Sequence, residues 1–310
     1  MLAYVLRRLL LMVPTVFGVA LLTFLLFNAF GPDPVRTALG QHATPESMEN
    51  LRRQWALDRP LWLQFVDFLR QIVSFDYGRS FVTNEDLGSL LKAGALVSLS
   101  VTAPPFFFGG LVNVALALFI ARWRGGLVDQ GSRAMFIAGM SISGLVYVLV
   151  LQYLLAFKLG WFPISGFEPG LRAFAYLGLP WLILLLINMG PDIRLYRTLF
   201  LEEAGADYVR TARSKGASEA RVLARHVLPN AWVPIITSNV TNIPFLILGS
   251  FLMERFFSIP GIGSLTIDAL ARGDLPVLKA LTVLGAMALV VFNLLSDLLY
   301  AWADPRVRLG

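Results

Sequence analysis

Six long apolar runs without a charged residue constrain this sequence more than any other feature. They are Leu9–Phe30, Ala93–Ala121, Ala134–Phe157, Ala173–Pro191, Ala231–Met253 and Ala280–Ser296. Each run approaches the roughly 20 residues that a helix needs to cross a bilayer. The runs do not alternate polar and apolar residues as barrel strands would, and lipid leaves backbone groups without partners unless the chain is helical. We therefore expect an all-α membrane protein with six transmembrane helices.

The composition supports a bilayer as the solvent of this chain. Charged residues make up 15% of the sequence, whereas soluble proteins carry about 25%. The absence of cysteine excludes disulfides and thiolate chemistry, and the two histidines, His42 and His226, do not cluster. We therefore expect no metal site. We also expect no nucleic-acid partner, because basic residues in a membrane protein first report its orientation. The first run is too long for the apolar part of a cleaved signal and is expected to remain as the first span.

The charge distribution predicts the orientation of the chain. Basic residues outnumber acidic ones at both ends and in the second and fourth loops, whereas the opposite side is balanced. Basic loops stay on the cytoplasmic side, so both termini are expected in the cytoplasm.

The segment between the first two runs, residues 31–92, is too long for a simple connection. Apolar residues recur at helical spacing in LRRQWALDRPLWLQFVDFLRQIVSF, which predicts short amphipathic helices at the outer interface. A packed cap over the bundle without ligand contact is an equal alternative. We divide the chain into residues 1–92, with helix 1 and this extracytoplasmic segment, and residues 93–310, a five-helix core with a cytoplasmic segment at 202–229.

That cytoplasmic segment concentrates charge in an otherwise apolar chain. Leu201–Lys215 is predicted to be helical, and Gly216 follows where a left-handed backbone conformation favours glycine. A second helix is expected to begin after Ser218, with Glu219 in its first turn, and Pro229 marks the transition to the fifth run. Tyr208, Val209 and Ala212 could form an apolar face. A solvated charged loop is the alternative reading.

The spacing within this segment resembles a known motif. Membrane subunits of ATP-binding-cassette (ABC) importers present E-A-A-x-x-x-G-x(9)-I-x-L-P to their ATPases. Ala212, Gly216, Leu228 and Pro229 match it, while Arg210, Thr211 and His226 replace Glu, Ala and Ile. The version DYVRTARSKG, Asp207–Gly216, resembles that of dipeptide/oligopeptide importer permeases.

The resemblance to these permeases covers nearly the whole chain. Further matching stretches are Arg7–Leu10, LGWFPISG at Leu159–Gly166, ERFFSIPGIG at Glu254–Gly263, DLPV at Asp274–Val277 and NLLSDLLYAWADPR at Asn293–Arg306. The sequence departs from the family at Gly31–Pro34, where P-G-D-P is usual, and at Ser141–Gly144, where a proline is usual.

The resemblance implies a type I ABC importer permease for di- or oligopeptides. Its implied partners are a homologous second permease, two ABC ATPases that bind ATP and Mg, an extracytoplasmic substrate-binding protein and the lipid bilayer. The chain itself is expected to bind no cofactor and to catalyse nothing, since it has no G-x-x-x-x-G-K-[ST] loop and no hydrolase motif. Related importers carry nickel, glutathione or sugar oligomers, and these substrates remain alternatives.

Three groups of residues are candidates for the transport function. The expected ATPase-coupling residues are Asp207, Tyr208, Val209, Arg210, Thr211, Ala212, Arg213, Lys215, Gly216, Ser218, Glu219, Arg221 and Pro229. The fifth run carries neutral polar residues that suit peptide backbone groups, so the expected substrate pathway is Ser238, Asn239, Thr241, Asn242, Phe245 and Gly249. Hydrogen bonds between helices are an equally good explanation of these polar residues. The expected outer loop or gate is Glu254, Pro260, Gly261 and Gly263.

Two other classes of protein compete with the importer. An ion-coupled secondary carrier would use ionisable groups within the membrane to bind its driving ion. Such groups are few in this sequence, which counts against a carrier: Asp297 is the clearest, and Asp192 lies at the end of the fourth run. An intramembrane enzyme or a scaffold is the other rival, although no paired nucleophile and base are visible.

Overall fold

The computed structural model describes residues 2–31, 33–40 and 44–303, and this part of the chain is almost entirely helical. The N-terminal part comprises α1 (Leu2–Phe24), η1 (Leu25–Ala29), α2 (Pro34–Leu39), α3 (Pro45–Gln54), α4 (Leu61–Ser74), α5 (Leu87–Arg122), α6 (Leu127–Met140), α7 (Gly144–Leu151) and η3 (Gln152–Lys158). The remainder comprises η4 (Gly170–Arg172), α8 (Ala173–Ala204), α9 (Asp207–Ser214), α10 (Glu219–Val222), η5 (Leu223–Val227), α11 (Leu228–Val240), α12 (Ile243–Leu248), α13 (Phe251–Phe256), α14 (Ile262–Arg272) and α15 (Leu275–Ala303). The side chains of Arg7, Arg8, Asp297 and the residues that follow Asp297 lie outside the described residues.

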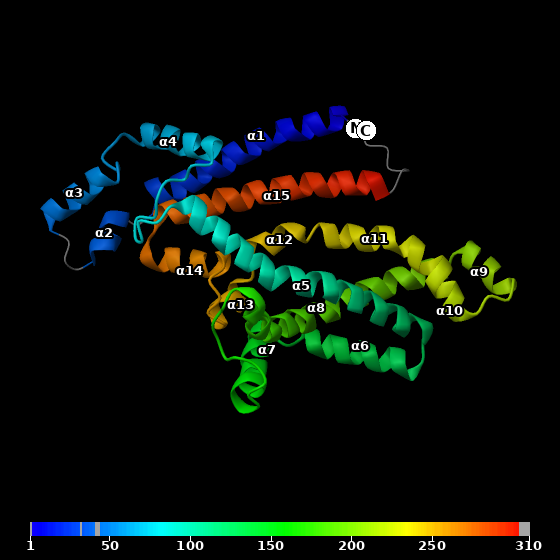
Figure 1. The fold of residues 1–310 in the computed structure, drawn as a ribbon. Coiled ribbons are helices and arrows are strands. Elements are labelled where there is room, and N and C mark those ends of the chain that lie inside the picture. The colour runs from blue at the N-terminus through cyan, green and yellow to red at the C-terminus, as the bar shows by residue number, and fades with distance from the viewer. Residues whose placement is uncertain (1, 32, 41–43, 304–310) are drawn as a thin grey trace.

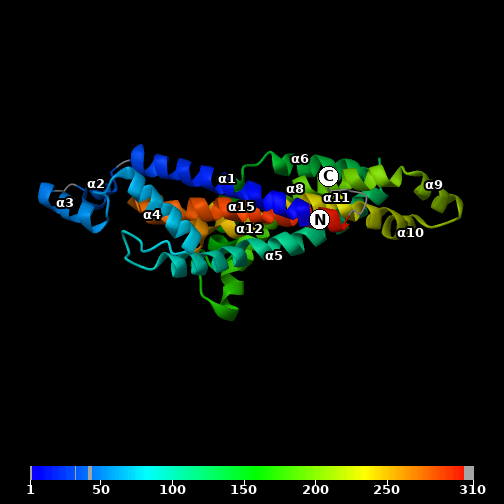
Figure 2. The ribbon, with the colours of Figure 1, turned by 90° about the horizontal axis from the view of Figure 1, so that it is seen from above.

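The molecule is elongated, with long helices running roughly along one axis. Figure 1 shows α2–α4 at one end and the hairpin of α9 and α10 at the other, with α1, α5, α8 and α15 between them. Figure 2, turned by 90°, keeps the same two ends apart. The amphipathic segment and the charged segment therefore lie at opposite ends of the bundle.

Four helices of the described chain are long and apolar enough to cross a membrane by themselves. They cover Leu10–Asn28, Leu87–Arg122, Gly170–Ala204 and Leu275–Leu295. A fifth candidate consists of Leu127–Met140 and Gly144–Lys158, which are bent by 92° at the break between them. All-helical, membrane-spanning architecture agrees with the expectation from the apolar runs.

The third apolar run differs from a straight span, because its helix breaks at Ser141–Ser143. The Ser141 hydroxyl donates to the Ile137 carbonyl and helps to end α6. Ser143 then adopts an extended conformation, and its side chain accepts a hydrogen bond from the Leu145 N–H at the start of α7. The break falls in Ser141–Gly144, where the family pattern led us to expect a proline.

The fifth run is also interrupted, into α11, α12 and α13. At the end of α11, the side chains of Thr241 and Asn242 both donate to the Ser238 carbonyl, at 2.8 and 3.1 Å. Such local bonds compete with the helical backbone pattern. Gly249 then takes a positive φ of 75°, which ends α12.

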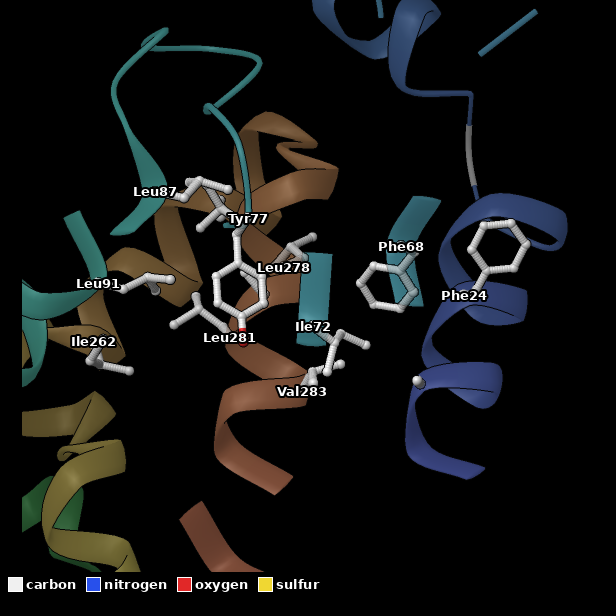
Figure 3. Packing of buried hydrophobic residues seen from close by; sticks show 14 residues of the cluster. Phe24, Phe68, Ile72, Tyr77, Leu87, Leu91, Ile262, Leu278, Leu281 and Val283 are labelled. Atoms are coloured by element: carbon white, nitrogen blue, oxygen red, sulfur yellow. The ribbon is translucent and has the colours of Figure 1, made fainter. Parts of the chain in front are cut away.

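The end of the bundle nearest α2–α4 has its own apolar core, formed by α1, α4, α5, α14 and α15. Figure 3 shows Phe24 of α1 beside Phe68 of α4, and Ile72 of α4 beside Val283 of α15. Asp274 fastens the loop between α4 and α5 to this core, because its carboxylate accepts hydrogen bonds from the Ser80 hydroxyl and from the Phe81 N–H. The DLPV stretch therefore holds the loop before α5 against the start of α15.

Candidate functional site

The turn between α9 and α10 is a tight helix-capping structure centred on Gly216. Gly216 has φ +80°, its N–H donates to the Arg213 carbonyl, and the Ala217 N–H donates to the Ala212 carbonyl. These two bonds form a Schellman motif, in which the residue with positive φ is usually glycine. The positive φ that we expected at Gly216 is confirmed.

The helix boundaries around this turn differ from the sequence prediction. Leu201–Lys215 is not one helix, because α8 ends at Ala204 and Ala206 is extended before α9 begins at Asp207. Ser218 stands at the start of α10 as expected, although its side chain makes no capping bond. Pro229 lies exposed in the first turn of α11, which continues from α10 through η5.

The apolar side chains of the hairpin face inward. We expected Tyr208, Val209 and Ala212 to form an apolar face; Tyr208 is 41% exposed, whereas Val209 and Ala212 are 0% and 9% exposed. Val209 and Ala212 pack in a cluster with side chains of α5, α8, α10, η5 and α11. The hairpin is therefore packed against the bundle through its apolar side chains, and its exposed surface consists mainly of polar groups.

The exposed surface of the hairpin is mainly charged. Asp207, Arg210, Lys215 and Arg221 are exposed, and Thr211 bonds back to the Asp207 carbonyl. Arg213 is occupied within the chain, because its guanidinium pairs with Glu219 at 2.7 Å and also donates to the Ala204 carbonyl. This pair joins α9 to α10 across the turn, and leaves Arg210 and Lys215 more accessible to a partner.

Tyr208 marks the junction between the hairpin and α8. Its hydroxyl donates to the Glu203 carboxylate. Partial burial and this carboxylate raise the pKa of Tyr208 to about 12, so the phenol stays protonated at neutral pH. The hydroxyl therefore acts as a donor at the base of α9.

A cavity of about 280 Å³ lies between α5, α8, α11 and α12. Of the expected pathway residues, Asn239 and Asn242 line it, whereas Ser238, Thr241 and Gly249 do not. The side chain of Phe245 lies outside the described residues. Asn239 is held in place by Tyr196, with contacts of 3.1 and 2.8 Å between the phenol oxygen and the two amide atoms.

Sequence reasoning missed the residues that α5 and α8 bring to this cavity. Asn113 on α5 donates to the Asp192 carboxylate on α8 at 2.9 Å, although the two residues are 79 positions apart. Thr102 and Asn188 line the same cavity. The only sequence signal was a polar residue within an apolar run, and such a residue does not reveal its partner.

A second cluster that the sequence did not predict joins α6 to α8. Asp129 is fully buried, and its carboxylate accepts two hydrogen bonds from Arg197, at 2.7 and 2.8 Å. The Gly125 N–H and Arg133 also donate to it. This bidentate pair fixes the start of α6 to the part of α8 that leads into the hairpin.

The segment that we expected to form the outer loop is organised around the buried carboxylate of Glu254. Ser98 and the backbone N–H groups of Ser250 and Ser264 donate to its two oxygens, at 2.7, 3.2 and 3.0 Å. Ser98 in turn accepts from the Ile262 N–H. A side chain at Gly261 would collide with the carboxylate, and a Cβ at Gly263 would lie 2.9 Å from it. Of the four expected outer-loop residues, Glu254, Gly261 and Gly263 thus come together here, and Pro260 is exposed next to Gly261 in the chain.

Comparisons with known proteins cover almost the entire chain. Residues 113–309 match the family described as binding-protein-dependent transport system inner membrane component, and residues 1–90 match the N-terminal region described for the same class of protein. A putative peptide transport system permease protein of Brucella abortus (strain 2308) is 34% identical over 99% of both chains. The di/tripeptide transport system permease protein DppB of Pseudomonas aeruginosa is 33% identical, and the glutathione transport system permease protein GsiC of Salmonella choleraesuis is 32% identical, each over 99% of both chains.

A solved structure shares the fold. The MetNI methionine ABC transporter in an inward-facing conformation matches with a TM-score of 0.55 and 16% identity, covering 69% of this chain and 96% of that one. Apolar helices at both ends of the sequence, the capped hairpin and matches along nearly the full length agree with one another. The chain therefore belongs to the family of binding-protein-dependent transport system inner membrane components, and it is a multi-pass inner-membrane permease.

Proposed function

We propose that this permease passes short peptides into the cytoplasm as one membrane subunit of an ABC importer. The observation that carries the proposal is the similarity of the whole chain to peptide and di/tripeptide permeases, together with the Gly216 turn in its cytoplasmic hairpin. The neutral amides at the cavity suit this substrate, because Asn side chains both donate to and accept from peptide backbone groups.

The proposed complex contains a second homologous permease, two cytoplasmic ATPases and an extracytoplasmic binding protein. ATP and Mg would be held by the ATPases, while this chain would bind no cofactor. Driving a gate from 1:99 to 99:1 requires about 5.5 kcal/mol of differential binding. The hairpin would receive that free energy, with Arg210 and Lys215 providing charge for docking and Gly216 setting the direction of α9.

The proposed topology has six spans with both termini in the cytoplasm. Five of them correspond to the candidate spans and the bent pair α6–α7, and the sixth would be the interrupted segment α11–α12. In this proposed topology α2–α4 would lie on the extracytoplasmic side, and the α9–α10 hairpin, at the opposite end of the bundle in Figure 1, would lie in the cytosol.

Reconstitution tests this proposal directly. The permease pair, ATPases and binding protein are placed in liposomes, and uptake of radiolabelled dialanine is followed with and without ATP. ATP-dependent uptake that also needs the binding protein supports the importer. Uptake by this chain alone, driven by a proton or sodium gradient, would instead establish the secondary carrier.

Glutathione is a second candidate substrate, because the glutathione permease of Salmonella choleraesuis is almost as similar as the peptide permeases. Competition between radiolabelled dialanine and unlabelled glutathione in the same liposomes separates the two. Full inhibition by equimolar glutathione would favour the tripeptide, whereas no inhibition would favour dipeptides.

A further inference from the structure

Asp192 is an acidic residue whose negative charge has no cationic partner in the described structure. It lies on the α8 segment identified as a candidate span, and it lines the cavity between α5, α8, α11 and α12. Its described polar partner is the Asn113 amide, and none of the ion pairs found in residues 2–31, 33–40 and 44–303 includes it. Ionisable groups within membrane spans are costly and commonly pair or mark a transport pathway.

Asn113 provides a second, independent sign of a missing donor. Its side chain is 1% exposed, and its amide nitrogen is used by Asp192. Its amide oxygen is buried without a hydrogen-bond partner. Burying a polar atom in this way costs about 1–3 kcal/mol, so such atoms are usually paired.

The other polar groups of the cavity do not neutralise Asp192. Asn239 is oriented by Tyr196, and the Asn188 amide donates to the Leu184 carbonyl one turn earlier. Thr102 donates to the Ser98 and Leu246 carbonyls. The Arg197 guanidinium, one turn beyond Asp192 on α8, is engaged by Asp129. The cavity therefore combines one uncompensated carboxylate with neutral amides and has room for a small polar group.

We infer that Asp192 and Asn113 form a binding site for a primary ammonium group, which in the proposed function is the free amino terminus of the transported peptide. An ammonium offers three donors and one positive charge, and it therefore complements a carboxylate beside an acceptor that lacks a donor. The neutral amides of Asn239 and Asn242 would then face the first peptide bond. This assignment rests on the proposed function for the identity of the ligand, whereas the attraction of cations to the cavity is independent of it.

The absence of cysteine from the chain makes a direct test possible. Asn188→Cys places one thiol in the cavity wall, one helical turn before Asp192, at an exposed position. The assembled complex is treated with a cationic reagent, trimethylammonium-ethyl methanethiosulfonate, and with an anionic one, sulfonatoethyl methanethiosulfonate, and modification of this chain is followed by mass spectrometry. A unit charge within a helical turn changes the ratio of the two rates by about fivefold even in a high effective dielectric.

The ratio of cationic to anionic labelling should therefore fall about fivefold when Asp192→Asn is added. Asp268→Asn, which neutralises an exposed acid on α14, is the matched control and should leave the ratio unchanged. Equal ratios with and without Asp192 would overturn the inference.

Protection experiments then identify the ammonium. Dialanine should slow labelling of the cysteine when Asp192 is present and not when it is replaced by Asn, whereas N-acetyl-dialanine should slow neither. Equal effects of the two peptides, including no effect of either, would overturn the assignment to the amino terminus. Failure of ATP-driven dialanine uptake by the unsubstituted complex would overturn the proposed function instead, and it would leave the labelling ratio unaffected.

Discussion

At the scale of single residues, Glu254 shows how one charged side chain can be structural in a membrane protein. Its carboxylate is completely buried, and it accepts hydrogen bonds from Ser98 on α5, from the Ser250 N–H just before α13 and from the Ser264 N–H in the first turn of α14. Glycine at 261 and 263 lets the backbone approach closely enough for this arrangement. The residue thus ties the outer loop to α5 rather than presenting its charge to a ligand.

Replacement of Glu254 by Gln should destabilise the protein by about 1–3 kcal/mol. Both carboxylate oxygens accept hydrogen bonds, so either orientation of the new amide turns an NH₂ group toward a backbone N–H. The apparent melting temperature of the purified complex in detergent measures the effect. Asp268→Asn removes an exposed pair with Arg255 and should change it little. Equal melting temperatures for Glu254→Gln and the unsubstituted protein would contradict the structural role.

At the scale of secondary-structure elements, the hairpin of α9 and α10 is defined by its turn and by its internal packing. The Schellman bonds at Gly216 and the pair between Arg213 and Glu219 fix the angle between the two helices. Val209 and Ala212 then bury this unit against the bundle. The hairpin is consequently a rigid element whose orientation depends on a single backbone conformation.

Replacement of Gly216 by Val should abolish substrate-stimulated ATP hydrolysis and peptide uptake without preventing membrane insertion. The space around a Cβ at this position is empty, so the cost arises from the positive φ, which is unfavourable by about 1–2 kcal/mol for ordinary residues and more for β-branched ones. Gly216→Asn is the matched control, because asparagine tolerates this conformation, and it should retain most of the activity. Normal uptake by the Val variant would refute a coupling role for the turn.

Sequence patterns identified these elements to different degrees. The apolar runs and the glycine position predicted α5, α8, α15 and the Gly216 turn, because hydropathy and positive φ are local properties. The breaks in the third and fifth runs escaped prediction, since they depend on serine, threonine and asparagine side chains that bond to nearby backbone. The pairing of Asn113 with Asp192 could not be predicted, because it depends on how α5 packs against α8.

At the scale of the whole molecule, the short helices α2–α4 and the α9–α10 hairpin lie far apart along a continuous bundle (Figures 1 and 2). The proposed topology assigns the first to the extracytoplasmic side and the second to the cytosol. The apolar cluster of the hairpin continues into α5, α8 and α11, as far as Val114 on α5 and Ile235 on α11. Transport in the proposed importer would therefore involve displacement of this packed unit as a body.

The proposed orientation predicts opposite accessibility of the two ends. Cysteine introduced at Glu49, exposed on α3, should react with a membrane-impermeant thiol reagent added to spheroplasts, whereas cysteine at Lys215 should react in inverted vesicles. Detergent-solubilised protein, in which both positions should react, is the control. Labelling of Lys215→Cys in intact spheroplasts would reverse the assigned orientation.

The apolar cluster that buries the hairpin also reaches the cavity between α5, α8, α11 and α12. Val114 adjoins Asn113 in sequence, and Tyr196 both belongs to the cluster and holds Asn239. Two residues that line the cavity, Asn113 and Asn239, are thus connected to the apolar cluster that buries the hairpin. In the proposed importer, a tilt of the hairpin would therefore be transmitted through these packed side chains to the wall of the cavity.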